Sequence, residues 1–197
     1  VYDKKQPKFR RICRFLEHIR EIESYLPAEG ELRICDLCCG KSYLSFAVYH
    51  YFAVLRGRRV SMTGVDLKPD VIEYCSSVAE SLGFSGLEFI CGNVLEYDSR
   101  ERGLPQLVVS LHACDTATDI VLTKAAQWHA KVILSTPCCH HALARVIDCP
   151  ELAFVTDHPF LSRKLCDVLT DAARLARLDA EGYVTTAMEL TDPDDTP

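Results

Sequence analysis

The sequence lacks any apolar run long enough to cross a membrane. Its most apolar long segment, residues 43–55, has 13 residues and is followed by Arg56, Arg58 and Arg59. A membrane-spanning helix needs about 18 or more consecutive apolar residues. We therefore expect no membrane partner, and we expect residues 43–55 to form a buried helix.

Internal repeats and low-complexity stretches are also missing, and we expect no signal peptide. The 197 residues are 48% hydrophobic, which excludes a disordered chain and fits a single globular core. The chain begins at Val1 rather than methionine and stops abruptly at Pro197. We expect the natural protein to continue beyond both ends. The oligomeric state is open.

An overall excess of positive charge is absent, because the net charge is −6. This excludes a basic groove for nucleic acid that covers the whole surface. The charge is uneven, however: residues 1–20 hold seven basic against two acidic side chains, and residues 171–197 hold two against seven. The basic segment could contact RNA phosphates, or it could be solvated or pack on another part of the protein.

Cysteine, by contrast, is abundant. Eleven cysteines are an odd number in a chain too long and too regular for a secreted disulfide scaffold. Cys35 and Cys91 lie in apolar, strand-like runs, where thiols behave as small hydrophobic groups. We therefore expect a reducing, cytoplasmic environment.

Short apolar runs alternate along the chain with helical patterns, which predicts a mostly parallel, doubly wound α/β sheet of the Rossmann-like type. We expect a basic helical extension over residues 1–30 and the main domain over residues 31–197, with an irregular insertion at residues 141–161. Strands are predicted at residues 32–37, 59–65, 87–91, 106–111, 131–135 and 183–190. Helices are predicted at residues 8–25, 42–56, 69–83, 116–129 and 162–180.

The turn after the first predicted strand is rich in small residues but does not match a nucleotide fingerprint. A dinucleotide-binding G-x-G-x-x-G pattern would need glycines where Cys38 and Tyr43 stand. A phosphate-binding loop ending in Gly40-Lys41-Ser42 would need a glycine at Cys35. A plain strand–turn–helix joint stays open as an alternative.

Polar residues follow the next two strands, at the edge where such sheets bind ligands. Asp66 could accept hydrogen bonds from both hydroxyls of a ribose, or it could cap the helix that begins near Pro69. Asn93 could read the edge of an adenine because an amide both donates and accepts, although asparagine is also common in turns.

Two unusual motifs follow the fourth and fifth strands: LHACDTATD at residues 111–119 and PCCHH at residues 137–141. Together with Asp36-x-x-x-Gly40, Asp66 and Gly92-Asn93, they make the chain resemble the class I S-adenosylmethionine-dependent methyltransferases. More narrowly, the chain is similar to the group that includes the tRNA acceptor-stem 2′-O-methyltransferases.

The resemblance implies S-adenosyl-L-methionine as the cofactor and an RNA, either tRNA or rRNA, as the acceptor. It places a loop around the methionine part, the ribose at Asp66 with Leu67, and the adenine at Asn93 with Val94. It places His112 and Cys114 at the pocket floor beside the sulfonium, with Leu111 also against the cofactor. The implied loop residues are Asp36, Cys38, Gly40 and Ser42. The implied catalytic candidates are His112, Asp115, Cys138, Cys139 and His140. His112 could act as a base or could be a structural histidine that hydrogen-bonds the strand ends, and Asp115 could either orient it or cap the next helix.

The chain also departs from the family pattern. Cys38 and Ser42 replace two usual glycines, and we expect the last strand of the family sheet to be missing. The loops after the first, fourth and fifth predicted strands carry a Cys/His cluster. Its members are Cys38, Cys39, His112, Cys114, Cys138, Cys139, His140 and His141. This cluster could instead bind zinc with one ligand from each loop, or form a redox-sensitive thiol pair. Adjacent Cys-Cys and His-His pairs are poor chelates, so we predict no metal site. The alternative function is a non-catalytic nucleotide-fold module that senses metal or redox state.

Overall fold

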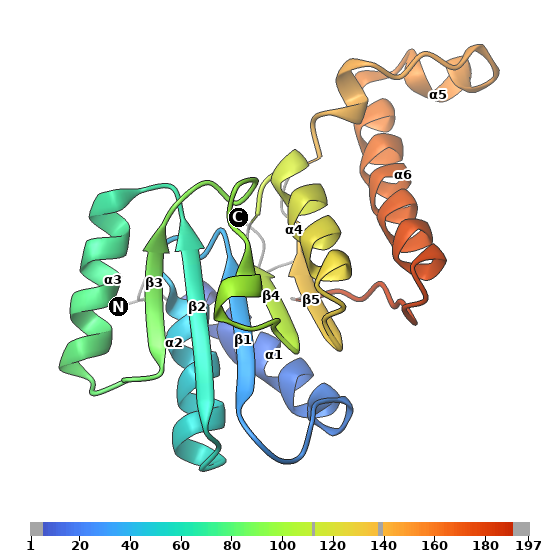
Figure 1. The fold of residues 1–197 in the computed structure, drawn as a ribbon. Coiled ribbons are helices and arrows are strands. Elements are labelled where there is room, and N and C mark those ends of the chain that lie inside the picture. The colour runs from blue at the N-terminus through green and yellow to red at the C-terminus, as the bar shows by residue number, and fades with distance from the viewer. Residues whose placement is uncertain (1–5, 112, 138–139, 191–197) are drawn as a thin grey trace.

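A computed structural model describes residues 6–111, 113–137 and 140–190 of the protein. Five parallel strands form one sheet in the order β3-β2-β1-β4-β5, and helices connect them (Figure 1). The strands are β1 (Leu32–Leu37), β2 (Val60–Asp66), β3 (Leu87–Cys91), β4 (Leu107–Leu111) and β5 (Val132–Thr136). The longer helices are α1 (Gln6–Ile22), α2 (Tyr43–Tyr49), α3 (Pro69–Ser81), α4 (Thr116–Gln127) and α6 (Pro159–Ala180).

The strand order reverses at β1. After β1, the chain forms β2 and β3 on one side of β1. It then returns to the other side of β1, where it forms β4 and β5. In register, Leu32 of β1 pairs with Val60 of β2, and Ile34 pairs with Leu107 of β4. In such sheets ligands bind outside the carboxyl ends of the strands at this reversal. The predicted doubly wound α/β fold is thus confirmed, and the loops after β1 and β4 flank the reversal.

Both faces of the sheet are covered, and the alternation of side chains along each strand decides which face each residue joins. On β1, Leu32 and Ile34 enter one apolar cluster, whereas Cys35 and Leu37 enter another. The first cluster packs against α1 and α2, which lie together behind the sheet in Figure 1. The second packs against α4. This double burial is why the strands read as continuous apolar runs.

The helix boundaries follow local sequence signals. Pro69 occupies the first turn of α3, where its missing N–H is no loss. Gly83 ends this helix at a φ of +69°, a backbone conformation that glycine adopts without steric cost. The predicted helix over residues 42–56 divides into α2 and a π-helical turn, η2 (His50–Leu55).

Helix α1 belongs to the body of the fold. Its residues Phe15 and Ile19 are buried in the first apolar cluster, with Leu26 of the following turn. A 3-10 turn, η1 (Glu23–Tyr25), ends the helix. One apolar stripe of α1 therefore faces the sheet, and the charged side chains of the helix lie on either side of this stripe.

The C-terminal prediction was wrong in one respect. Residues 183–190, expected to form a sixth strand, have no strand structure. Tyr183 instead donates its hydroxyl to the carbonyl of Ala130 at 2.9 Å, and Leu190 packs against the first apolar cluster. Val184 is fully exposed, and neither side-chain contact supplies a neighbouring strand. A strand needs a partner to complete its backbone hydrogen bonds, which is why an apolar, strand-like pattern misled the prediction.

The predicted insertion is short and mostly turns. It contains η4 (Leu143–Arg145), η5 (Pro150–Leu152) and α5 (Ala153–Thr156) before α6 begins. Figure 1 shows α5 projecting beyond the end of α6, at the far side of α4 from the rest of the sheet.

In the part of the chain that the structure describes, no helix combines the length and the apolar character needed to cross a bilayer. The nine cysteines among the described residues are all free thiols.

Candidate functional site

A pocket of about 500 Å³ opens at the carboxyl ends of β1, β2 and β4, where the strand order reverses. Six of the residues that the sequence predicts to bind the cofactor line its first-loop and second-strand sides: Asp36, Cys38, Gly40, Ser42, Asp66 and Leu67. Val94 and Leu111 also line it. The pocket therefore brings together most of the predicted cofactor residues.

The loop after β1 follows a tight path that glycines would adopt more easily. Cys38, Gly40 and Ser42 have φ angles of 62°, 53° and 57°. A left-handed conformation costs a residue with a side chain roughly 1–2 kcal/mol. Backbone hydrogen bonds hold the path: the Cys39 amide donates to the Val65 carbonyl at 3.0 Å, and the Ser42 amide donates to Cys39 at 2.9 Å. The chain thus holds this left-handed path although residues with side chains occupy positions 38 and 42.

Asp66 ties this loop to the second strand. Its Oδ2 accepts the Gly40 amide at 2.8 Å, and its Oδ1 accepts the Lys68 amide at 3.2 Å. A carboxylate has about four acceptor positions, so both oxygens keep a lone pair for a further donor. The side chain lines the pocket. Asp66 therefore shapes the first loop and keeps acceptor positions free, while its contact with a ribose stays a prediction.

Asp36 is buried beneath the loop, with 1% of its surface exposed. The Ser45 hydroxyl donates to its Oδ2 at 2.5 Å, whereas its buried Oδ1 has no hydrogen-bond partner among the described residues. Burial raises the pKa of Asp36 to about 7, and the nearby charge of Asp66 adds to the rise. A buried, half-satisfied carboxyl at a pocket wall can bind a donor or a cation from a ligand.

The thiols of the first loop are held in the protonated form. Burial raises the pKa of Cys38 to about 11, with added repulsion from Asp66 and Asp36. Burial also raises the pKa of Cys39. Metal binding and thiol oxidation both need the thiolate. Across residues 6–111, 113–137 and 140–190 no group of three or more His, Cys, Asp or Glu side chains is arranged so that it could hold a metal ion. The first-loop thiols thus favour neither the metal nor the redox alternative.

The two residues expected near the adenine, Asn93 and Val94, differ in where their side chains lie. Val94 is 8% exposed and lines the pocket next to Gly92. The Asn93 side chain turns to the backbone instead, where its Oδ1 accepts the Leu95 amide at 3.0 Å. Such a bond is the usual role of asparagine in a turn. The adenine contact of Asn93 stays a prediction.

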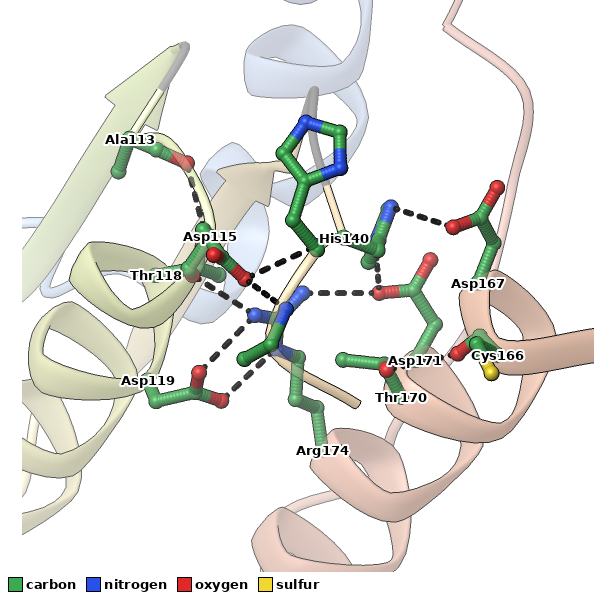
Figure 2. Close-up of polar contacts among 12 residues, drawn as sticks. Ala113, Asp115, Thr118, Asp119, His140, Cys166, Asp167, Thr170, Asp171 and Arg174 are labelled. Atoms are coloured by element: carbon green, nitrogen blue, oxygen red, sulfur yellow. Dashed lines mark hydrogen bonds and ion pairs between the residues drawn. The ribbon is translucent and has the colours of Figure 1, made fainter. Parts of the chain in front are cut away.

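Asp115 begins α4, but its side chain does not cap that helix. Its Oδ1 accepts the amides of His141 and Ala142, at 3.1 and 3.0 Å, across 26 and 27 residues of sequence (Figure 2). The Ala142 and His141 amides lower the pKa of Asp115, so the carboxylate is ionised at neutral pH. Asp115 therefore links the turn after β4 to the segment after β5, the two segments that carry the unusual motifs.

His140 faces α6. Its Nε2 lies 2.8 Å from Oδ1 of Asp171, and its Nδ1 lies 3.8 Å from Oδ1 of Asp167 (Figure 2). Only 12% of its side chain is exposed. The ring is thus oriented by two carboxylates of α6, which the sequence alone did not indicate.

Arg174 joins these parts into one network. Its Nε and Nη2 donate to the two carboxylate oxygens of Asp119 at 2.8 and 3.0 Å, and Nη1 donates to Asp171 at 3.1 Å. Nη2 also donates to the backbone carbonyl of Asp115 at 2.9 Å. With 7% of its side chain exposed, Arg174 connects α6 to the first turn of α4 and, through Asp171, to His140 (Figure 2).

His112, Cys138 and Cys139 lie outside the described residues, and their catalytic roles stay predictions. The structure places the other two catalytic candidates, Asp115 and His140, in the network at the ends of β4 and β5. Cys114 and Ala117, from the turn and helix after β4, line the pocket. The candidate cofactor pocket and the candidate catalytic motifs therefore meet at the β4–α4 turn.

Four basic residues line the pocket that the sequence did not assign to it: Lys8, Arg11, Lys41 and Lys68. Lys8 and Arg11 come from α1. The sequence showed that α1 is basic. Its helical periodicity could not show that the N-terminal part of α1 lines the pocket at the carboxyl ends of the strands.

The family comparison is consistent with this geometry. A family model described as "Methyltransferase domain" matches residues 7–146, most of the chain from α1 to η4. The chain belongs to this methyltransferase family. The family assignment supports S-adenosyl-L-methionine as the cofactor, as the sequence predicts.

Individual relatives are more distant. The chain is 30% identical over 108 residues to a mouse (Mus musculus) "Glutathione S-transferase C-terminal domain-containing protein". The match covers 55% of this chain and 16% of that protein, so the chain spans a small part of the curated relative.

Solved structures that are similar include the N-terminal domain of EvdMO1 with S-adenosylhomocysteine (SAH) bound. It is 16% identical with a TM-score of 0.44, covering 62% of this chain and 47% of that one. An rRNA methylase from Streptococcus thermophilus is 12% identical with a TM-score of 0.44, covering 56% and 61%.

The residues of the pocket fit the cofactor. Asp36 lines the pocket and has one carboxyl oxygen, Oδ1, without a partner among the described residues, and Asp66 keeps free acceptor positions for hydroxyl groups. Leu67, Val94 and Leu111 provide apolar walls. Ligand pockets commonly combine such walls with a few placed polar groups, in volumes of about 300–1,000 Å³.

Proposed function

We propose that this methyltransferase domain transfers a methyl group from S-adenosyl-L-methionine to RNA. The bound cofactor would supply an electrophilic methyl group on a positively charged sulfur. Holding the acceptor in line at roughly 3–3.5 Å would then provide much of the rate enhancement. Asp36, the first loop and Asp66 would hold the cofactor, leaving the β4–α4 turn beside the acceptor.

The observation that carries the RNA proposal is the arrangement of lysines at the pocket. Lys8, Lys41 and Lys68 are exposed and line the same pocket, although the protein as a whole is acidic. They come from three separate segments: α1, the first loop and the turn after β2. Positive charge gathered from three segments around one opening suits a phosphate backbone entering it.

In this proposal the catalytic candidates belong to the acceptor side. Histidine is a common general base in catalysis, and His112 would take the proton of an acceptor hydroxyl. Asp115 and His140 are positioned by the Arg174 network, and Cys138 and Cys139 follow β5. Their direct contact with an acceptor stays a prediction.

The proposal is tested by incubating the protein with methyl-labelled S-adenosyl-L-methionine and purified tRNA or rRNA. We expect label that is sensitive to ribonuclease. Label that enters only protein or small molecules would refute the RNA acceptor. So would the absence of label in RNA when calorimetry shows that the cofactor binds.

Salt dependence tests the lysines themselves. For single-stranded RNA the slope of log K against log salt is about −0.7 per phosphate contact, so Lys8→Gln, Lys41→Gln and Lys68→Gln combined should reduce the slope by about 2. Lys131→Gln with Lys164→Gln, two exposed lysines away from the pocket, is the control. An unchanged slope in the triple variant would exclude these lysines from RNA binding.

A further inference from the structure

Tyr43 is the single aromatic side chain among the described residues that line the pocket. More than half of it, 56%, is exposed. Within the described part of the chain, its ring has no aromatic or cationic partner and its hydroxyl has no hydrogen bond. Both the ring and the hydroxyl are therefore available to a ligand that enters the pocket.

The position of Tyr43 on α2 explains this exposure. Tyr43 is the first residue of the helix, and Leu44 and Val48 on the inner stripe are buried in the first apolar cluster. His50, about two turns after Tyr43, is exposed like it, so the two residues lie along the outer stripe. Helix α2 thus directs Tyr43 away from the core, at the end of the helix that meets the pocket.

A second tyrosine on the same helix shows what a structural role requires. Tyr49 is 7% exposed, its ring centroid lies 4.9 Å from that of Phe84, and its hydroxyl accepts the Gly86 amide at 3.0 Å. Tyr43 has none of these contacts. The core of the protein therefore does not account for an aromatic side chain at position 43.

The ring lies among positive charges. Lys41 precedes it by two residues, and Lys8 and Lys68 line the same pocket from other segments; all three are exposed. Lysines attract a single strand and a duplex alike, because both carry phosphates. Proteins that bind single-stranded nucleic acid add to such charges an aromatic face on which a base stacks. Tyr43 supplies that face here.

We propose that Tyr43 is a stacking platform for an unpaired base of the acceptor RNA, and that the protein therefore binds a single strand or a loop in preference to a continuous duplex. The inference rests on the proposed function, because it assumes that RNA enters this pocket. Inside a duplex each base is stacked between its neighbours, so the ring can reach only a base that has left the stack.

Three RNA probes separate stacking from phosphate contact on the whole chain. The first is an unstructured single strand, the second is a duplex that contains this strand, and the third is a strand of abasic riboses, which keeps the phosphates. Tyr43→Ala removes the ring and Tyr43→Phe keeps it. The matched control is Tyr74→Ala, because Tyr74 is 62% exposed on α3 and does not line the pocket. Fluorescence anisotropy measures each Kd.

We expect wild-type protein to bind the single strand more tightly than the duplex. Tyr43→Ala should weaken single-strand binding about five- to a hundredfold, the effect of losing one stacked base. Tyr43→Phe and Tyr74→Ala should stay within about twofold of wild type, and so should Tyr43→Ala on the duplex and on the abasic strand. Neither of these last two probes offers an unstacked base along its length.

Several outcomes would overturn the inference. Unchanged single-strand affinity in Tyr43→Ala would exclude stacking, and an equal loss on the abasic strand would show that Tyr43 only shapes the pocket. A wild-type preference for the duplex would contradict the single-stranded acceptor. Calorimetry with SAH adds a further check, since a loss of SAH affinity in Tyr43→Ala as large as the loss for RNA would place the ring in the cofactor site. If wild-type protein binds none of the three probes, the RNA proposal itself fails, which is distinct from a variant that binds like wild type.

Discussion

Arg174 of α6 binds both carboxylate oxygens of Asp119 in the first turn of α4, 55 residues earlier in the chain. The same guanidinium reaches the Asp115 carbonyl and Asp171. Since Asp115 has a φ of 52°, which is unusual for a residue with a side chain, the contacts on its carbonyl and carboxylate hold the turn in a strained shape. The long C-terminal helix thereby stabilises the turn beside the pocket.

Removing Arg174 should destabilise the protein. In Arg174→Met, three acidic or carbonyl partners lose a charged donor, and we expect the free energy of unfolding to fall by about 1.5–3 kcal/mol. The carboxylates of Asp119 and Asp171 are about two-fifths exposed, so water can replace part of the loss. Urea denaturation measures the change. Arg177→Met, an exposed arginine one turn later, is the control and should change stability by less than about 0.5 kcal/mol.

The buried carboxyl of Asp36 should make stability depend on pH. Its folded-state pKa of about 7 lies above the unfolded value of about 3.9, so the folded protein binds more protons between these limits. The contribution of Asp36 is therefore complete below about pH 4 and declines as the pH rises towards 7. In Asp36→Asn this decline is absent, because the amide does not ionise.

Denaturation at pH 4.5 and at pH 7.5 measures the effect. We expect the stability of Asp36→Asn relative to wild type to be higher at pH 7.5 than at pH 4.5. Asp148→Asn, which changes an exposed carboxyl, should show no such difference. A relative stability that is equal at both pH values would show that Asp36 is already ionised at pH 4.5.

Position 38 should prefer glycine. Cys38 has a φ of 62°, and a residue with a side chain pays roughly 1–2 kcal/mol for that conformation, whereas glycine does not. Glycine loses more entropy on folding, by roughly 0.5–1 kcal/mol, so the net gain of Cys38→Gly should be up to about 1 kcal/mol. We expect the order of melting temperatures to be Gly above Ala above Val. A melting temperature of Cys38→Val that equals or exceeds that of Cys38→Gly would contradict the backbone argument.

Asp66 should matter both to the cofactor and to the first loop. Asp66→Ala removes the acceptor for the Gly40 amide and the acceptors proposed for the ribose, so we expect SAH binding to weaken by roughly 1.5–3 kcal/mol, about tenfold or more. Asp66→Asn keeps one carbonyl oxygen for Gly40 and should lie between alanine and wild type. Calorimetry distinguishes the three proteins, with exposed Asp70→Ala as the control. Unchanged binding in Asp66→Ala would show that the ribose lies elsewhere.

Much of the fold follows from local patterns. The strands predicted at residues 32–37 and 87–91 have the same bounds as β1 and β3. Each is a short apolar run between turn residues, and this local pattern predicts a strand without knowledge of the neighbouring elements. Pro69 and Gly83 marked the region of α3. The position of the pocket followed from topology, since the carboxyl ends of parallel strands meet at one edge.

Predictions that depended on a partner element were less successful. Residues 183–190 have a strand-like pattern, but a strand exists only when a neighbour completes its hydrogen bonds. Tyr183 and Leu190 found side-chain contacts instead. Asp115 does not cap α4, one of its two expected roles, because its carboxylate accepts the amides of His141 and Ala142. Its other expected role, orienting His112, stays a prediction, since His112 lies outside the described residues.

The alternation of strands and helices, the family motifs and the small, acid-bearing loop after β1 follow from the order of the amino acids, because each depends on residues close together in the chain. Three other features became visible only once the helices and strands were packed together: Arg11 lines the pocket, Asp36 keeps one oxygen unsatisfied among the described residues, and Arg174 connects α6 to Asp119. The reason is physical: a buried charge takes its partner from whatever element packs against it, and packing brings together residues that no local pattern relates.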